Sequence, residues 1–161
     1  MIRVAAVLSG LLVLAAVQFS RVVPDAYGVF LATWTPSNKP FCAAIGSSAQ
    51  WHAIFEPAAV MGRNRPFSPP DSLWRDRAML VVARVVPAGD PSHVFVLTSI
   101  SEANGALVER YSFNPTAPAS STMKWWMGII VQKPLPAKVA FVENGRRVCD
   151  LDVSRGRRRS P

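Results

Sequence analysis

Six runs of apolar, β-branched and aromatic residues fill the second half of the chain, and each has the length of a strand. They span residues 79–86, 93–100, 106–113, 125–132, 137–142 and 146–152. Turn-forming residues bound the runs: Asn104-Gly105 precede the third, and Asn144-Gly145 join the last two with the signature of a type I′ hairpin. Because most connections are too short for helical crossovers, the pattern predicts a mainly β fold, an antiparallel sheet or small β-sandwich of about six strands with one short helix.

Alternation within these runs predicts which side chains face the core. In the last run Cys149 shares a face with Leu151, so its sulfur is expected to point inward. Residues 106–113 carry one charged residue on each face, Glu109 and Arg110, which favours a strand near the edge of a sheet.

The first half of the chain has less regular patterning. Residues 21–47 contain three prolines and no clear period, which predicts an irregular tether or wrapping arm. Ser48 is a candidate cap for a short helix that carries Trp51 on its apolar face and ends at Pro57. The proline-rich residues 57–72 indicate a long loop.

The extreme N-terminus has the pattern of an export signal. Residues 4–20 are uncharged and mostly apolar, with Arg3 before them and Arg21 after them. A cleaved signal peptide with its small-residue exit near Ala15 fits this pattern, whereas the length of the run also fits a retained membrane anchor. A buried core helix over residues 4–20 is the third interpretation. The first two place the rest of the chain outside the cytoplasm, as a periplasmic, secreted or membrane-anchored protein.

The chain therefore divides into four expected parts. They are a signal peptide or anchor over 1–20, the arm over 21–47, a β-rich globular domain over 48–153 and a basic tail over 154–161.

The two cysteines agree with export. Cys42 stands near the start of the folded part and Cys149 near its end, and in an oxidising compartment such a pair predicts a disulfide. Two buried free thiols are the alternative. No Cys-x-x-Cys motif is present and His52 and His93 stand alone, so neither a metal site nor a cofactor is expected.

Eighteen Lys and Arg against ten Asp and Glu give a net charge of +8, which favours anionic partners. Arginines concentrate in the tail, at Arg155, Arg157, Arg158 and Arg159. In a cytosolic protein such a segment would indicate nucleic-acid binding. Export disfavours nucleic acid and makes an anionic membrane surface the better candidate, with a disordered solubilising end as the alternative.

Candidate catalytic groups are few. The sequence has no glycine-rich phosphate loop, no Gly-x-Ser-x-Gly elbow and no His-Glu-x-x-His helix. Asp150 and Asp152 share a strand face, a spacing that would allow acid–base work on a glycan. A noncatalytic protein is expected, and the rival is an envelope hydrolase that acts on glycan or peptide through these carboxylates or through His52 or His93.

The order of features from Trp51 onward resembles the C-terminal domain of bacterial protease-complex stabilising proteins of the PrcB type. The resemblance rests on the Trp-containing helix, the strand Asp-Arg-Ala-Met-Leu-Val-Val at 76–82, and the meander of Thr-Ser-Ile at 98–100 and Asn-Gly-Ala-Leu at 104–107. The glycine-rich turn usual in that family does not stand out around residues 87–92. The resemblance implies a noncatalytic domain that binds or stabilises another exported protein, and it assigns no functional residues.

The sequence thus predicts a noncatalytic exported β-domain that binds an envelope protein or surface. The candidate contacts are Trp125 and Trp126, which are adjacent in one strand and must point to opposite sides. One of the two is expected in the core, and the other is expected under the arm or available to a partner.

Overall fold

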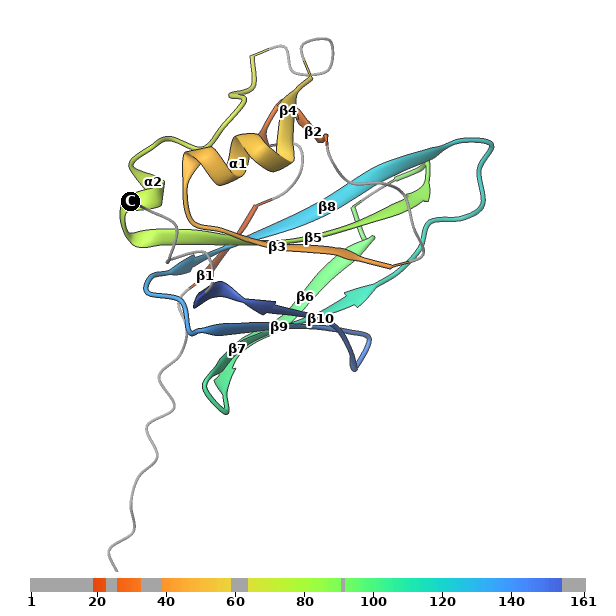
Figure 1. Ribbon diagram of the computed structural model, residues 1–161. Coiled ribbons are helices and arrows are strands. Elements are labelled where there is room, and N and C mark those ends of the chain that lie inside the picture. The colour runs from red at the N-terminus through yellow and green to blue at the C-terminus, as the bar shows by residue number, and fades with distance from the viewer. Residues whose placement is uncertain (1–18, 23–25, 33–38, 59–63, 91, 155–161) are drawn as a thin grey trace, which may run out of the picture.

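The computed structural model describes residues 19–22, 26–32, 39–58, 64–90 and 92–154, and it shows two four-stranded sheets packed face to face (Figure 1). The first sheet has the order β1-β8-β5-β3 and is antiparallel throughout. Its strands are β1 (Phe19–Val22), β3 (Phe41–Ile45), β5 (Arg77–Pro87) and β8 (Thr122–Gln132). The predicted mainly β class is confirmed.

The second sheet has the order β10-β9-β7-β6. Its strands are β6 (Phe95–Ala103), β7 (Ala106–Phe113), β9 (Lys138–Glu143) and β10 (Arg146–Asp152). Two antiparallel hairpins, β6–β7 and β9–β10, meet through a parallel pairing of β7 with β9. Asn144 and Gly145 have φ values of 49° and 79°, so the hairpin between β9 and β10 has the predicted left-handed turn residues.

Strand β5 is covered on both faces, which explains its continuous apolar sequence. Ala78, Leu80 and Val82 face the core between the two sheets. Met79 and Val81, which alternate with them, belong to a second core on the other face of the first sheet.

That second core is covered by short elements that form a third layer above the first sheet (Figure 1). They are α1 (Ser48–Ile54), α2 (Leu73–Asp76) and the two-stranded pair β2 (Val29–Leu31) and β4 (Phe55–Pro57). Trp51 of α1 is fully buried at its centre and stacks on Phe55 with ring centroids 4.2 Å apart. Burial of large aromatic rings supplies much of the energy that holds this layer to the sheet.

The structure corrects several local expectations. Ser47, not Ser48, caps α1, because its hydroxyl accepts the backbone N–H of Gln50 at 3.2 Å. The helix ends at Ile54, and the residues expected to extend it to Pro57 form β4.

One longer-range expectation is also wrong in part. The irregular structure expected over 21–47 does not hold for β2, β3 and the end of β1, since β3 completes the first sheet by pairing with β5. Strand β7 lies between β9 and the edge strand β6, which agrees with the expected place near the edge of a sheet.

The expected signal peptide or anchor falls mostly outside the described residues, and only Phe19 and Ser20 of it appear, in β1. Within the described ranges, neither helix has the length and apolar character needed to cross a bilayer.

Candidate functional site

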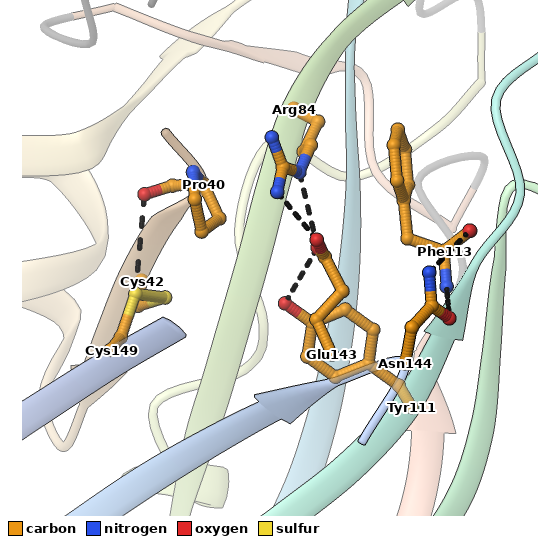
Figure 2. A network of polar contacts seen from close by, with 8 residues as sticks. All are labelled: Pro40, Cys42, Arg84, Tyr111, Phe113, Glu143, Asn144 and Cys149. Carbon is orange, nitrogen blue, oxygen red and sulfur yellow. Dashed lines mark hydrogen bonds and ion pairs between the residues drawn. A yellow bond between two sulfur atoms is a disulfide. The ribbon is translucent and has the colours of Figure 1, made fainter. Parts of the chain in front are cut away.

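A disulfide joins Cys42 of β3 to Cys149 of β10, with Cα atoms 6.4 Å apart (Figure 2). Both strands are edge strands, one in each sheet, so the bond closes one side of the sandwich covalently. Both cysteines pack against the core, which confirms the predicted pairing and the inward sulfur. A register shift between Arg147 and Cys149 leaves Val148 as an extra residue, a β-bulge in β10.

The two adjacent tryptophans of β8 lie on opposite faces of the first sheet. Trp126 is 2% exposed and packs under the third layer, with its ring centroid 5.0 Å from that of Phe55. Trp125 packs against the core between the sheets and keeps part of its surface accessible. Of the two predicted contact residues, Trp125 is therefore the one that a partner can reach.

Trp125 also belongs to the wall of a cavity of about 370 Å³ between β2 and the first half of β8. The lining residues are Tyr27, Gly28, Val29, Phe30, Leu31, Ala32, Ala58, Arg65, Met123, Lys124, Trp125 and Trp126. Four of these side chains are aromatic and two are basic, and the described lining holds no carboxylate. Phe30 is 47% exposed, so a large apolar ring stands open at the rim.

At the same place two backbone edges have no partner among the described strands. Strand β2 pairs with β4 on one side and with no other described strand. Strand β1 covers β8 only at 128–131, so among the described strands residues 122–127 pair only with β5. The Lys124 ammonium donates to the Leu31 carbonyl at 3.3 Å and holds β2 beside β8. The cavity thus combines aromatic walls with strand edges that can accept another strand.

A second group of polar residues lies inside the sandwich (Figure 2). Arg84 of β5 donates to both carboxylate oxygens of Glu143 of β9, at 3.1 and 2.5 Å, and so ties one sheet to the other. The Tyr111 hydroxyl donates to the same carboxylate at 3.1 Å. Burial, followed by the charge of Glu143, raises the pKa of Tyr111 far above its ordinary value, so the phenol stays protonated. The Arg84 guanidinium carbon lies over the Phe113 ring, 4.9 Å from its centroid.

Glu109, like Glu143, is a buried charged residue that the sequence analysis did not place in the core. It is 0% exposed on β7, and neither carboxyl oxygen has a hydrogen-bond partner among the described residues. Burial raises the pKa of this carboxyl to about 8, so the neutral acid prevails in the folded protein at pH 7. The available signal was its alternation with Leu107 and Tyr111, which places it on an apolar face of the strand.

The residues considered for catalysis lie on the surface and apart. His52 and His93 are exposed, one on α1 and the other just before β6. Asp150 forms an ion pair with Arg147, and Asp152 accepts hydrogen bonds from Ser154. These contacts are those of solvated strand positions.

Groups of three or more potential metal-ligating side chains are absent from the described part of the chain. The four arginines of the tail, Arg155, Arg157, Arg158 and Arg159, lie outside the described residues.

No protein-family model, no curated protein and no solved structure matches the chain. The resemblance to the PrcB type accordingly stays a prediction.

Proposed function

We propose that this protein is a noncatalytic exported domain that binds an extended, acidic and apolar segment of another envelope protein. The observation that carries the proposal is the aromatic cavity beside the edges of β2 and β8 that pair with no further described strand. The disulfide between the two sheets supports export, because such bonds persist in oxidising compartments.

The composition of the cavity favours a protein segment as ligand. Tyr and Trp side chains dominate binding energy at protein interfaces because they bury large areas at a low entropic cost. Phe30 and Trp125 present such surface here without being fully buried. A segment bound in extended form would add main-chain hydrogen bonds to these edges of β2 and β8, while its alternate side chains enter the cavity.

The positive charge at the cavity favours a segment with acidic residues. Lys124 and Arg65 line the cavity, and the whole chain carries a net charge of +8. Acidic residues next to apolar ones would meet complementary charge at the rim, which raises the association rate more than the affinity. The basic tail, residues 154–161, adds a second electrostatic contribution in this proposal, toward the partner or toward an anionic membrane surface.

The test is selection of peptides from a displayed library of random eight-residue sequences on the full chain with its disulfide intact. Selected peptides should alternate apolar or aromatic residues with Asp or Glu. Their Kd, measured by fluorescence anisotropy, should rise about tenfold or more in Phe30→Ser and in Trp125→Ser.

Val96→Ser is the matched control, because Val96 is also a large exposed apolar residue, 41% exposed on β6 of the other sheet. Circular dichroism verifies that each variant folds. Peptides that bind Phe30→Ser as tightly as the unchanged protein, or that lose affinity equally in Val96→Ser, would overturn the proposal.

A further inference from the structure

A second cavity, of about 570 Å³, lies at the other end of β8, where the sandwich opens toward the loop that leads to β9. It is lined by Ala44, Gly46, Ser47, Gln50, Arg75, Asp76, Ala78, Lys133, Pro134, Leu135 and Val153. Its volume falls within the range of about 300 to 1,000 Å³ that is typical of small-molecule sites. It shares no lining residue with the aromatic cavity.

The inner wall of this cavity is the apolar interior of the sandwich. Ala78 and Leu135 belong to the core between the sheets, and Ala44 and Val153 pack against that core. Ala44 of β3 and Val153 are only partly buried, so they present apolar surface to the cavity. An aliphatic group placed there would be removed from water on several sides.

The rim is polar and carries more positive than negative charge. The Lys133 ammonium donates to the carbonyls of Gly46 at 2.7 Å and of Trp74 at 2.6 Å, which fixes its position. An ammonium has three N–H donors, so these two bonds leave one for a ligand. Arg75 adds a second positive charge, and Asp76, the one carboxylate of the described rim, lies 3.6 Å from the guanidinium of Arg77 outside the lining.

From this combination we propose that the cavity binds a single-chain amphiphile with an anionic head, of the fatty-acid class. The aliphatic chain lies against Ala44, Leu135 and Val153, and the carboxylate accepts from Lys133 with Arg75 beside it. A charge-assisted hydrogen bond to a fixed, half-buried ammonium is stronger than one to a mobile surface lysine, because less side-chain entropy is lost on binding.

The first experiment compares ligands on the unchanged full chain by isothermal titration calorimetry. The probes are dodecanoate below its micelle concentration, dodecanol and inorganic phosphate. Dodecanoate should bind with one-to-one stoichiometry, at least about tenfold more tightly than either of the other two. Equal binding of dodecanol would overturn the role of the anionic head, and equal binding of phosphate would overturn the role of the apolar wall.

The second experiment tests the position of the head group. Lys133→Met keeps the aliphatic stem but removes the charge, and it should raise the Kd for dodecanoate about tenfold. Lys138→Met, on the exposed surface of β9, is the matched control and should leave the Kd unchanged. Equal affinity of the two variants would place the ligand elsewhere.

Two controls remain: whether the ligand is a dissolved molecule or a membrane lipid, and whether the Lys133→Met variant folds. Binding that appears only with vesicles of anionic phospholipid, and not with dissolved dodecanoate, would replace the cavity by surface association. If Lys133→Met does not fold, Arg75→Met tests the same rim at an exposed residue of α2, and the ligand comparison on the unchanged chain still decides the proposal.

Discussion

Replacing Glu109 by Gln should change how the stability of this protein depends on pH. Glu109 is fully buried on β7, and its pKa of about 8 in the folded state compares with an ordinary value of 4.5. Tyr111, which the charge of Glu109 influences, and the Arg84–Glu143 pair are the polar groups of the same interior. Gln keeps the shape of the side chain but cannot ionise.

The sign and size of the change in the free energy of unfolding follow from the pKa of Glu109 in the folded and unfolded states. Below pH 4.5 the carboxyl is protonated in both states and costs nothing through ionisation. Between pH 4.5 and 8 the unfolded chain releases a proton that the folded chain keeps, so the free energy of unfolding falls by about 1.4 kcal/mol per pH step. The loss attributable to Glu109 is thus about 3 kcal/mol at pH 7 and about 5 kcal/mol above pH 8.

The assay is urea unfolding followed by tryptophan fluorescence at each pH from 4 to 9. The quantity of interest is the free energy of unfolding of Glu109→Gln minus that of the unchanged protein, because the other titrating groups cancel in this difference. It should rise by several kcal/mol from pH 4 to pH 9. Any constant cost of the buried amide shifts the whole curve without changing its slope.

Glu102→Gln, at an exposed position near the end of β6, controls for the carboxylate-to-amide change itself. If the stability difference for Glu109→Gln is the same at pH 4 and pH 9, the carboxyl ionises as easily inside the fold as in the unfolded chain. The argument from burial would then be wrong.

Three further perturbations have defined outcomes. Glu143→Gln should lower the free energy of unfolding by about 3 kcal/mol, because Arg84 keeps a buried charge without its carboxylate; Arg84→Met added to Glu143→Met should recover part of the loss in the same urea assay. Reducing the Cys42–Cys149 bond, which spans a sequence separation of 107, should cost about 4 to 5 kcal/mol, and a thermal scan with and without reductant that shows equal Tm values would contradict this. Gly145→Ala, at φ 79°, should cost about 1 kcal/mol by calorimetry, with no effect if the turn relaxes.

The strands of the second half were predictable because their signal is local. Residues 106–113 and 146–152 form strands over the bounds that their apolar runs predict, and the Asn-Gly turn between the last two strands has the expected conformation. The parallel pairing of β7 with β9 was not predictable, because β8 separates these two segments in the sequence. A local sequence pattern does not identify which distant strand a given strand pairs with. The short strands β2 and β3 escaped for the same reason, since each is defined by the strand it pairs with.

The candidate sites also contain features that local sequence predicts and features that it does not. The disulfide was predictable from two cysteines and the expectation of export, and the placement of Trp125 and Trp126 on opposite faces follows from strand geometry. The walls of both cavities combine residues from distant segments, such as Phe30 with Met123. The spacing of these residues in the sequence does not predict that they lie close together.

The path of β8 has a consequence for how the molecule folds. The chain leaves the second sheet after β7, crosses to the first sheet as β8 and returns as β9, which then lies parallel to β7. The central pairing of the second sheet therefore closes a loop that contains a strand of the first. Non-local pairings of this kind form slowly, because the chain loses conformational entropy on closing the loop before the stabilising contacts are made. Neither sheet is an independent folding unit, and the domain is expected to unfold in one cooperative transition in which both sheets lose protection from hydrogen exchange together.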